Sequence, residues 1–205
     1  MLTRFVPLTL IATGFVFVTA CSSTPSAVSA KSDQPATVTE APVTGKTAFW
    51  EMYKLAHAWS PDAMVLSLKS SPLPDVPVKD GKAPIWTAMF VSAAKKQAHD
   101  FTYRAITEGT KRKGVISGEA QTWLGPVPKG QPFSTADMHL DSDLAFATAA
   151  KEADAWLKNN PGKDLHFVLG KESRFPAPIW EVYWGDEQKP VAVIVNAVDG
   201  KVLKN

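Results

Sequence analysis

Apolar side chains recur with the period of a helix in two segments of the chain, residues 49–59 and 146–157. Spacings of three and four positions put such residues on one face of a helix, so each segment is predicted to be amphipathic and helical. The second helix is expected to begin at Asp141 or Ser142, whose side chains can accept hydrogen bonds from free backbone amides, and to end at residues 159–162. The apolar positions are Phe49, Met52, Tyr53, Ala56 and Trp59 in the first segment, and Phe146, Ala149, Ala150, Ala153, Trp156 and Leu157 in the second.

After each helix the period of the pattern changes to two, which is typical of strands. Trp86, Ala88 and Phe90 share one side of a predicted strand, and Trp180, Val182 and Trp184 share one side of another. Shorter apolar runs predict further strands at residues 63–68, 101–107 and 115–124, and at 165–169, 191–196 and 201–203. The sequence therefore predicts an α+β fold in which a helix followed by an antiparallel meander occurs twice.

The two halves also share letters at a nearly constant offset. Phe49, Ala56, Ala58 and Trp59 recur 97 positions later as Phe146, Ala153, Ala155 and Trp156, and residues 83–86 (Ala-Pro-Ile-Trp) recur 94 positions later at 177–180. Two matching blocks in the same order indicate an internal repeat. We expect a first unit over residues 46–128 and a second over 129–205, with the Pro- and Gly-containing segment 126–130 at their junction. Whether the two sheets join or only pack side by side is open.

The second unit resembles a PepSY-type domain. The matching segments are residues 178–182 (Pro-Ile-Trp-Glu-Val) and residues 193–203 (Val-Ile-Val-Asn-Ala-Val-Asp-Gly-Lys-Val-Leu). The first unit matches less well, because its turn at residues 108–114 is longer. The resemblance implies a helix packed on an antiparallel meander, as in cystatin-like folds, and an extracytoplasmic binding or regulatory module. It supplies no catalytic residues.

The N-terminal segment has the layout of a signal peptide, with one positive charge followed by an apolar run at residues 5–18 that is short for a bilayer span. Residues 18–21 (Val-Thr-Ala-Cys) resemble the lipobox of bacterial lipoproteins. This resemblance implies cleavage of residues 1–20 and attachment to a membrane through lipid, including an acyl chain such as palmitate, on Cys21. Ser22 and Ser23 follow without an aspartate, which favours the outer membrane, facing the periplasm, in a host with two membranes.

Residues 21–45 differ in composition from the rest of the chain. They are rich in Ser, Thr, Pro, Ala and Val and contain no aromatic residue, so they cannot bury enough apolar surface to fold. We expect a flexible linker after the lipidated Cys21, with a coil dimension on the order of 25–30 Å. Because Cys21 is the only cysteine, an internal disulfide is excluded.

Charge and motifs exclude several functions. The formal net charge is +2, which argues against a nucleic-acid partner. The four histidines are scattered without metal-ligand spacing, and the sequence contains neither a Gly-x-Ser-x-Gly elbow nor a phosphate-binding loop. We therefore predict that the protein is not an enzyme and carries no metal or cofactor.

Three tryptophans are candidates for contact with a partner. Trp59, Trp86, Trp156 and Trp180 occupy equivalent places in the two units and are expected in the core. Trp50, Trp123 and Trp184 are less constrained by the repeat. Because exposed aromatic residues are frequent anchors at interfaces, these three are the predicted partner-contact residues.

The function expected from the sequence is binding or regulation of another cell-envelope component, with a protein as the expected partner. Two alternatives remain, and both place a site between the units. One is a small-ligand-binding lipoprotein. The other is an envelope hydrolase in which Asp137, His139 and Asp141 meet groups of the first unit.

Overall fold

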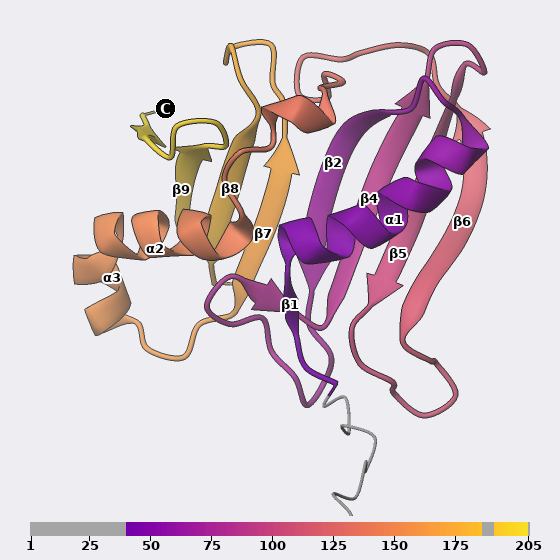
Figure 1. Cartoon of the computed structure of the whole chain (residues 1–205). Helices are drawn as coiled ribbons and strands as arrows, with labels where there is room; N and C mark the ends of the chain where they lie inside the picture. Colours follow the sequence, from indigo (N-terminus) through magenta and orange to yellow (C-terminus); the bar gives the residue numbers. More distant parts are fainter. Residues whose placement is uncertain (1–39, 186–190, 205) are drawn as a thin grey trace, which may run out of the picture. The chain divides into compact units, whose positions relative to one another are not determined.

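An eight-stranded antiparallel sheet dominates the computed structural model, which describes residues 40–185 and 191–204 within one compact unit. The strand order is β10-β9-β8-β7-β2-β4-β5-β6, and the long helices lie across one face (Figure 1). The predicted α+β class is thus confirmed. The elements are β1 (Val43–Thr44), α1 (Gly45–Trp59), β2 (Met64–Ser71), β3 (Lys82–Ala83), β4 (Ile85–Ser92), β5 (Gln97–Arg104), β6 (Gly114–Thr122), η1 (Thr135–Asp137), α2 (Ser142–Glu152), α3 (Asp154–Asn159), β7 (Leu165–Gly170), β8 (Ile179–Trp184), β9 (Val191–Asn196) and β10 (Val202–Leu203).

The halves of the chain meet at the centre of this sheet. Strands β2, β4, β5 and β6 come from the first half and β7 to β10 from the second, and β2 pairs antiparallel with β7. The pair is short, with Ser67 opposite Gly170, Leu68 opposite Leu169, and Lys69 opposite Val168. The question that the sequence left open is therefore answered, because the two sheets join edge to edge into one.

The core lies between the helices and the sheet, where the predicted alternation places it. Trp86 and Trp180 are fully buried, and their rings meet edge to face with centroids 6.2 Å apart. Phe167 of β7 lies 6.2 Å from each of them. Trp59 and Trp156 were also expected in the core but are only partly buried, because Trp59 ends α1 and Trp156 belongs to the short helix α3.

The N-termini of the two long helices meet head to head. The Asp141 carboxylate accepts hydrogen bonds from the backbone N–H of Ser142, at the start of α2, and of Lys46, in the first turn of α1. Ser142 Oγ accepts from the backbone N–H of Gly45. A side chain at position 45 would not fit, since a Cβ there would lie 2.9 Å from the Trp180 ring. Asp141 is therefore the N-cap that the sequence suggested, and it also serves α1.

Hydrogen-bonded structure is present before the predicted boundary at residue 46. The Glu40 carboxylate accepts hydrogen bonds from the backbone N–H and the hydroxyl of Thr107, and β1 pairs with β3. The linker composition extends through these residues, but backbone pairing does not require apolar side chains. The second predicted helix is divided at Ala153 into α2 and α3.

Equivalent positions of the two halves make equivalent hydrogen bonds. Trp86 Nε1 donates to the carbonyl of Val43, and Trp180 Nε1 donates to the carbonyl of Leu140, in both cases just before a helix. The backbone N–H of Ala105 bonds the carbonyl of Pro84, and that of Ala197 bonds the carbonyl of Pro178. Each indole therefore fixes its central strand to the segment that leads into the helix of the same half.

Candidate binding site on the helix-free face of the sheet

One face of the sheet carries no helix within the described residues (Figure 1). Successive side chains of a strand point to opposite faces, so the neighbours of the buried core residues lie on this helix-free face. They are mostly half-buried and chemically mixed. The central ones are Thr87 and Met89 of β4, Val168 of β7, and Glu181 and Tyr183 of β8.

A pocket of about 290 Å³ opens on this face where the two halves join. Its floor includes the apolar side chains of Leu66, Met89, Val168 and Ile179, which come from four adjacent strands. Two loops form its rim, residues 123–134 after β6 and 171–178 after β7. Backbone hydrogen bonds hold these loops together, one from Gln131 N–H to Lys171 O (2.9 Å) and one from Ser173 N–H to Pro128 O (2.8 Å).

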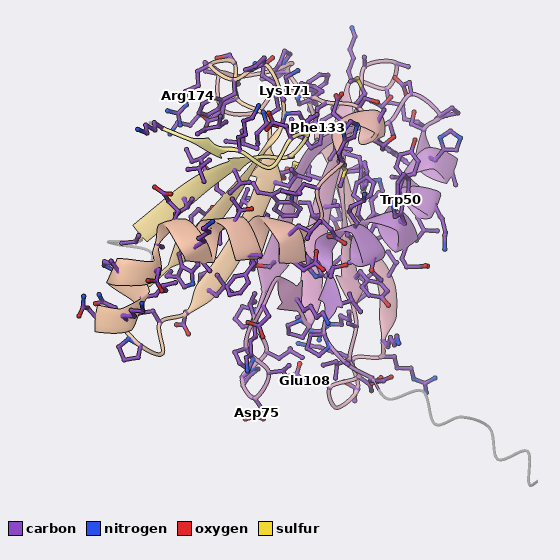
Figure 2. The ribbon with its side chains drawn as sticks, turned by 60° about the vertical axis from the view of Figure 1, so that its left-hand side comes forward. Trp50, Asp75, Glu108, Phe133, Lys171 and Arg174 are labelled. Carbon is purple, nitrogen blue, oxygen red and sulfur yellow. The ribbon has the colours of Figure 1, made fainter. Side chains whose placement is uncertain are left out.

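Positive charge predominates around the pocket. Lys69, Lys129 and Lys171 line it, and none of them has an ion pair within the described residues. Of the two lining carboxylates, Glu172 is paired with Arg174. Figure 2 shows Lys171 and Arg174 in the loop at one end of the sheet. The lysines are thus available to a ligand, whereas one carboxylate is already neutralised.

Glu181 is the polar group on the floor. Burial, followed by the negative charge of Glu172, raises the pKa of the Glu181 carboxyl above its ordinary value. Its hydrogen bond from the Tyr183 hydroxyl is long, at 3.5 Å, and burial together with Glu181 raises the pKa of Tyr183 to about 12. A weakly partnered carboxyl group therefore lies among apolar side chains, where a donor from a ligand would be favourable.

The edge strand β6 is a second candidate surface. It pairs with β5 on one side only, and most of its side chains are exposed, including Ile116 at 50%. The opposite edge, β10, has only two residues. An open edge of nine residues offers backbone groups to an added strand.

The predicted partner-contact tryptophans differ in exposure. Trp50 lies on the outer side of α1 and is 44% exposed (Figure 2). Trp123 is partly exposed just after β6, where its backbone N–H donates to the backbone carbonyl of Lys96. Trp184 is only 3% exposed and packs near Phe146. The prediction for Trp184 is therefore wrong as a surface contact, because the side-chain alternation of β8 turns this residue toward the helices.

The residues of the hydrolase alternative have structural roles. Asp137 forms a capping box with Ser134 in η1. The His139 side chain is exposed, and its carbonyl accepts from Lys46 Nζ. Asp141 does meet the first half, but its partner there is a backbone amide. The three side chains are thus not assembled around a nucleophile.

No group of three or more His, Cys, Asp or Glu residues that could hold a metal ion occurs among the described residues. None of the helices in the described part of the chain is long and apolar enough to cross a membrane. Cys21 and the signal peptide lie outside the described residues.

The pocket residues were not identified from the sequence. Lys69, Lys129 and Lys171 are far apart along the chain. Glu181 occupies the polar position of a strand with alternating apolar and polar residues. The pairing of β2 with β7 and the hydrogen bonds between the two rim loops bring the three lysines and Glu181 together. The one available signal was Glu181 itself, an acidic residue within the apolar segment 179–184.

Comparisons with known proteins give little further guidance. No protein-family model matches the chain, and no curated protein sequence does either. Among solved structures, the chain is similar to one described as a "putative lipoprotein" from Clostridium difficile 630. The two share 13% sequence identity, with 80% of this chain and 91% of that chain covered, and the TM-score is 0.44. This similarity is too distant for the neighbour's fold, location or function to be transferred.

Proposed function

We propose that this protein is an extracytoplasmic lipoprotein, held to a membrane through lipid on Cys21, whose helix-free sheet face binds a protein of the cell envelope. The lipobox-like segment 18–21 and the apolar run before it support the anchoring. The observation that carries the binding role is the helix-free face itself. Its central side chains are half-buried and mixed in chemistry, although no described helix covers them.

The dimensions of the face suit a protein partner. Eight strands at a spacing of about 4.8 Å make it roughly 35 Å wide, and strands of this length are about 20–30 Å long. The resulting area, on the order of 700–1,000 Å², matches the roughly 800 Å² that each partner buries in a standard interface. Tyr183 and His166 contribute half-buried rings, and aromatic residues, tyrosine especially, are enriched where interfaces are strongest.

The two halves are proposed to be duplicated PepSY-like units. The repeated sequence blocks support this, and so do the equivalent hydrogen bonds of Trp86 and Trp180. In this view the duplication creates the binding face, because joining β2 to β7 doubles the width of a four-stranded sheet. The resemblance to PepSY-type domains also implies a regulatory role toward a partner protein, and it supplies no catalytic residues.

Binding of a small ligand is the second candidate function, and the pocket at the β2–β7 junction favours it. This location agrees with the alternative that placed a ligand site between the two units. The hydrolytic alternative has no comparable support, because Asp137 and Asp141 are engaged in capping.

Site-specific photocrosslinking in the source bacterium tests the proposed function. A photoreactive phenylalanine analogue is placed at Thr87 or Tyr183 on the helix-free face, and at Leu144 or Lys158 on the helix side as matched controls. We expect one envelope protein to be crosslinked from both face positions and from neither control. A parallel Cys21→Ser chain should lose acyl labelling, leave the membrane fraction and crosslink more weakly. Equal crosslinking from all four positions, or none from the face, would contradict the binding role.

A further inference from the structure

The junction pocket combines three kinds of groups. Its floor is apolar, through Leu66, Met89, Val168 and Ile179. Its rim carries the ammonium groups of Lys129 and Lys171, from two loops tied by backbone hydrogen bonds, and Lys69 adds a third. A half-buried carboxyl group, that of Glu181, lines the same pocket from strand β8.

We propose that this pocket binds a carboxylate that is attached, through a carbon bearing an apolar side chain, to an N–H group. The end of a peptide chain and a free N-acyl amino acid share this chemistry. The lysines would bind the carboxylate, Glu181 would accept the N–H, and the apolar floor would hold the side chain. The inference rests on the proposed role of the helix-free face in binding, but it requires no particular protein partner.

Charge supports an anionic ligand. Among the described residues, three ammonium groups without an ion pair line the pocket against two carboxylates, and one of these, Glu172, already has Arg174 as its partner. A charge-assisted hydrogen bond is roughly twice as strong as a neutral one, so an incoming carboxylate gains more here than an amide would. Lys129 and Arg174 also lie close enough to Glu181 to oppose the rise of its pKa, so two positive charges lie near that group.

The size of the pocket and the hydrogen bonding of Glu181 support the other two features of the proposed ligand, its apolar side chain and its N–H group. A cavity of about 290 Å³ is at the lower end of the range for ligand sites, roughly 300–1,000 Å³, and therefore suits one residue with its backbone groups. Within the described part of the chain, the one hydrogen bond to the Glu181 side chain is the long one from Tyr183. Since a half-buried polar group gains stability from a good partner, an N–H donor of the ligand would complete its coordination.

Nuclear magnetic resonance titration of the soluble chain beginning at Ser22 provides the test. The probes are N-acetyl-leucine and its uncharged counterpart N-acetyl-leucinamide. We expect the acid to shift the resonances of β2, β7 and β8, and the amide to bind about tenfold more weakly or worse, as expected for loss of a charged hydrogen bond. Equal binding of the two probes, or no shifts at these strands, would overturn the proposal.

Two variants locate the site. Gly170 lies on the helix-free face of β7 with open space above it, since a Cβ at this position would have the Leu66 carbonyl oxygen as its nearest atom, 3.9 Å away. Gly170→Val should therefore fill the pocket and abolish binding while the protein stays folded. Replacement of both Lys129 and Lys171 by Gln should weaken binding of the acid about tenfold, whereas the same change at Lys151 and Lys158, on the helix side, should have no effect. If the variant changed at Lys151 and Lys158 lost as much affinity for the acid as the variant changed at Lys129 and Lys171, the assignment would be contradicted.

A matched pair of pentapeptides ending in leucine, with a free or an amidated C-terminus, separates the two sources of the ligand. Tighter binding of the free-acid peptide than of N-acetyl-leucine would identify a chain terminus, and equal binding would identify a free small acid. Either result supports the pocket. Failure of all probes while photocrosslinking from Thr87 succeeds would reject this inference and leave the proposed function intact. Binding of the acid probes without photocrosslinking from the helix-free face would reject the proposed protein partner and leave this inference intact.

Discussion

Asp62 ties the end of helix α1 to the turn between β4 and β5. Its Oδ1 accepts hydrogen bonds from Ser60 Oγ at 2.6 Å and from Ser92 Oγ at 2.7 Å, and its Oδ2 accepts from the backbone N–H of Ala94 at 2.9 Å. Both serines are buried. The bond from Ser60, with those from Ala94 and Ser92, holds the pKa of Asp62 well below its ordinary value. The charged form of this one carboxylate is therefore linked to the folded state.

We expect Asp62→Asn to lower the melting temperature at pH 7. The melting temperature of the variant should also fall less steeply than that of the wild type as the pH is lowered toward 2. A carboxyl group whose pKa is lower in the folded state stabilises the protein above its unfolded-state pKa, about 3.9. That contribution declines as the pH falls below this value toward the folded-state pKa. Thermal unfolding between pH 7 and pH 2 should thus show the gap between wild type and variant closing below about pH 4. The exposed Asp75→Asn is the control, and a gap independent of pH would contradict the assignment.

The two long helices depend on a shared N-terminal cap. The side chain of the residue just before a helix commonly accepts a hydrogen bond from one of the free N–H groups of the first turn. Here Asp141 does this for α2 and also accepts from Lys46 of α1. Its negative charge faces the positive ends of two helix dipoles, which favours it electrostatically. One carboxylate thus joins the two halves on the helix side, opposite the β2–β7 junction.

Asp141→Ala should cost about 1–3 kcal/mol in the free energy of unfolding, since each lost N-cap costs about 0.5–2 kcal/mol. Asp141→Asn should recover much of this loss, because its amide oxygen can still accept. Chemical denaturation measures both effects. Asp143→Ala is the matched control, since Asp143 lies in the same turn but bonds only its neighbour Leu144. Equal destabilisation by the two alanine variants would show that the shared cap has no special role.

The elements could be predicted from the sequence to a far greater extent than the binding site. The periods of 3.6 and two located α1, α2, β4 and β8, and Asp141 was foreseen as a cap. Side-chain patterns do not encode the short β1–β3 pairing, which depends on backbone groups. They also could not reveal the pocket, because its lysines belong to β2 and to two separate loops, which the fold brings together where β2 pairs with β7.

At the level of the whole molecule, one core serves both halves. The buried residues of the two halves form a single apolar cluster, and Trp86 contacts both Phe167 and Trp180 across the junction. A further bond crosses it, from the backbone N–H of Phe167 to Ser70 Oγ. The predicted units 46–128 and 129–205 are therefore halves of one sheet and one core, whatever their origin.

Trp86→Ala should consequently destabilise both halves together. Loss of a buried tryptophan costs about 3–5 kcal/mol, and because Trp86 packs against Trp180, the loss should spread to β8 and β9. Hydrogen–deuterium exchange should show amide protection falling by similar factors in β5 and in β8. The milder Trp86→Phe provides the same comparison if the alanine variant does not fold. Protection of β8 that stays at the wild-type level while β5 exchanges faster would show that each half has its own cooperative core, and the junction pocket would then lie between two independently folding units.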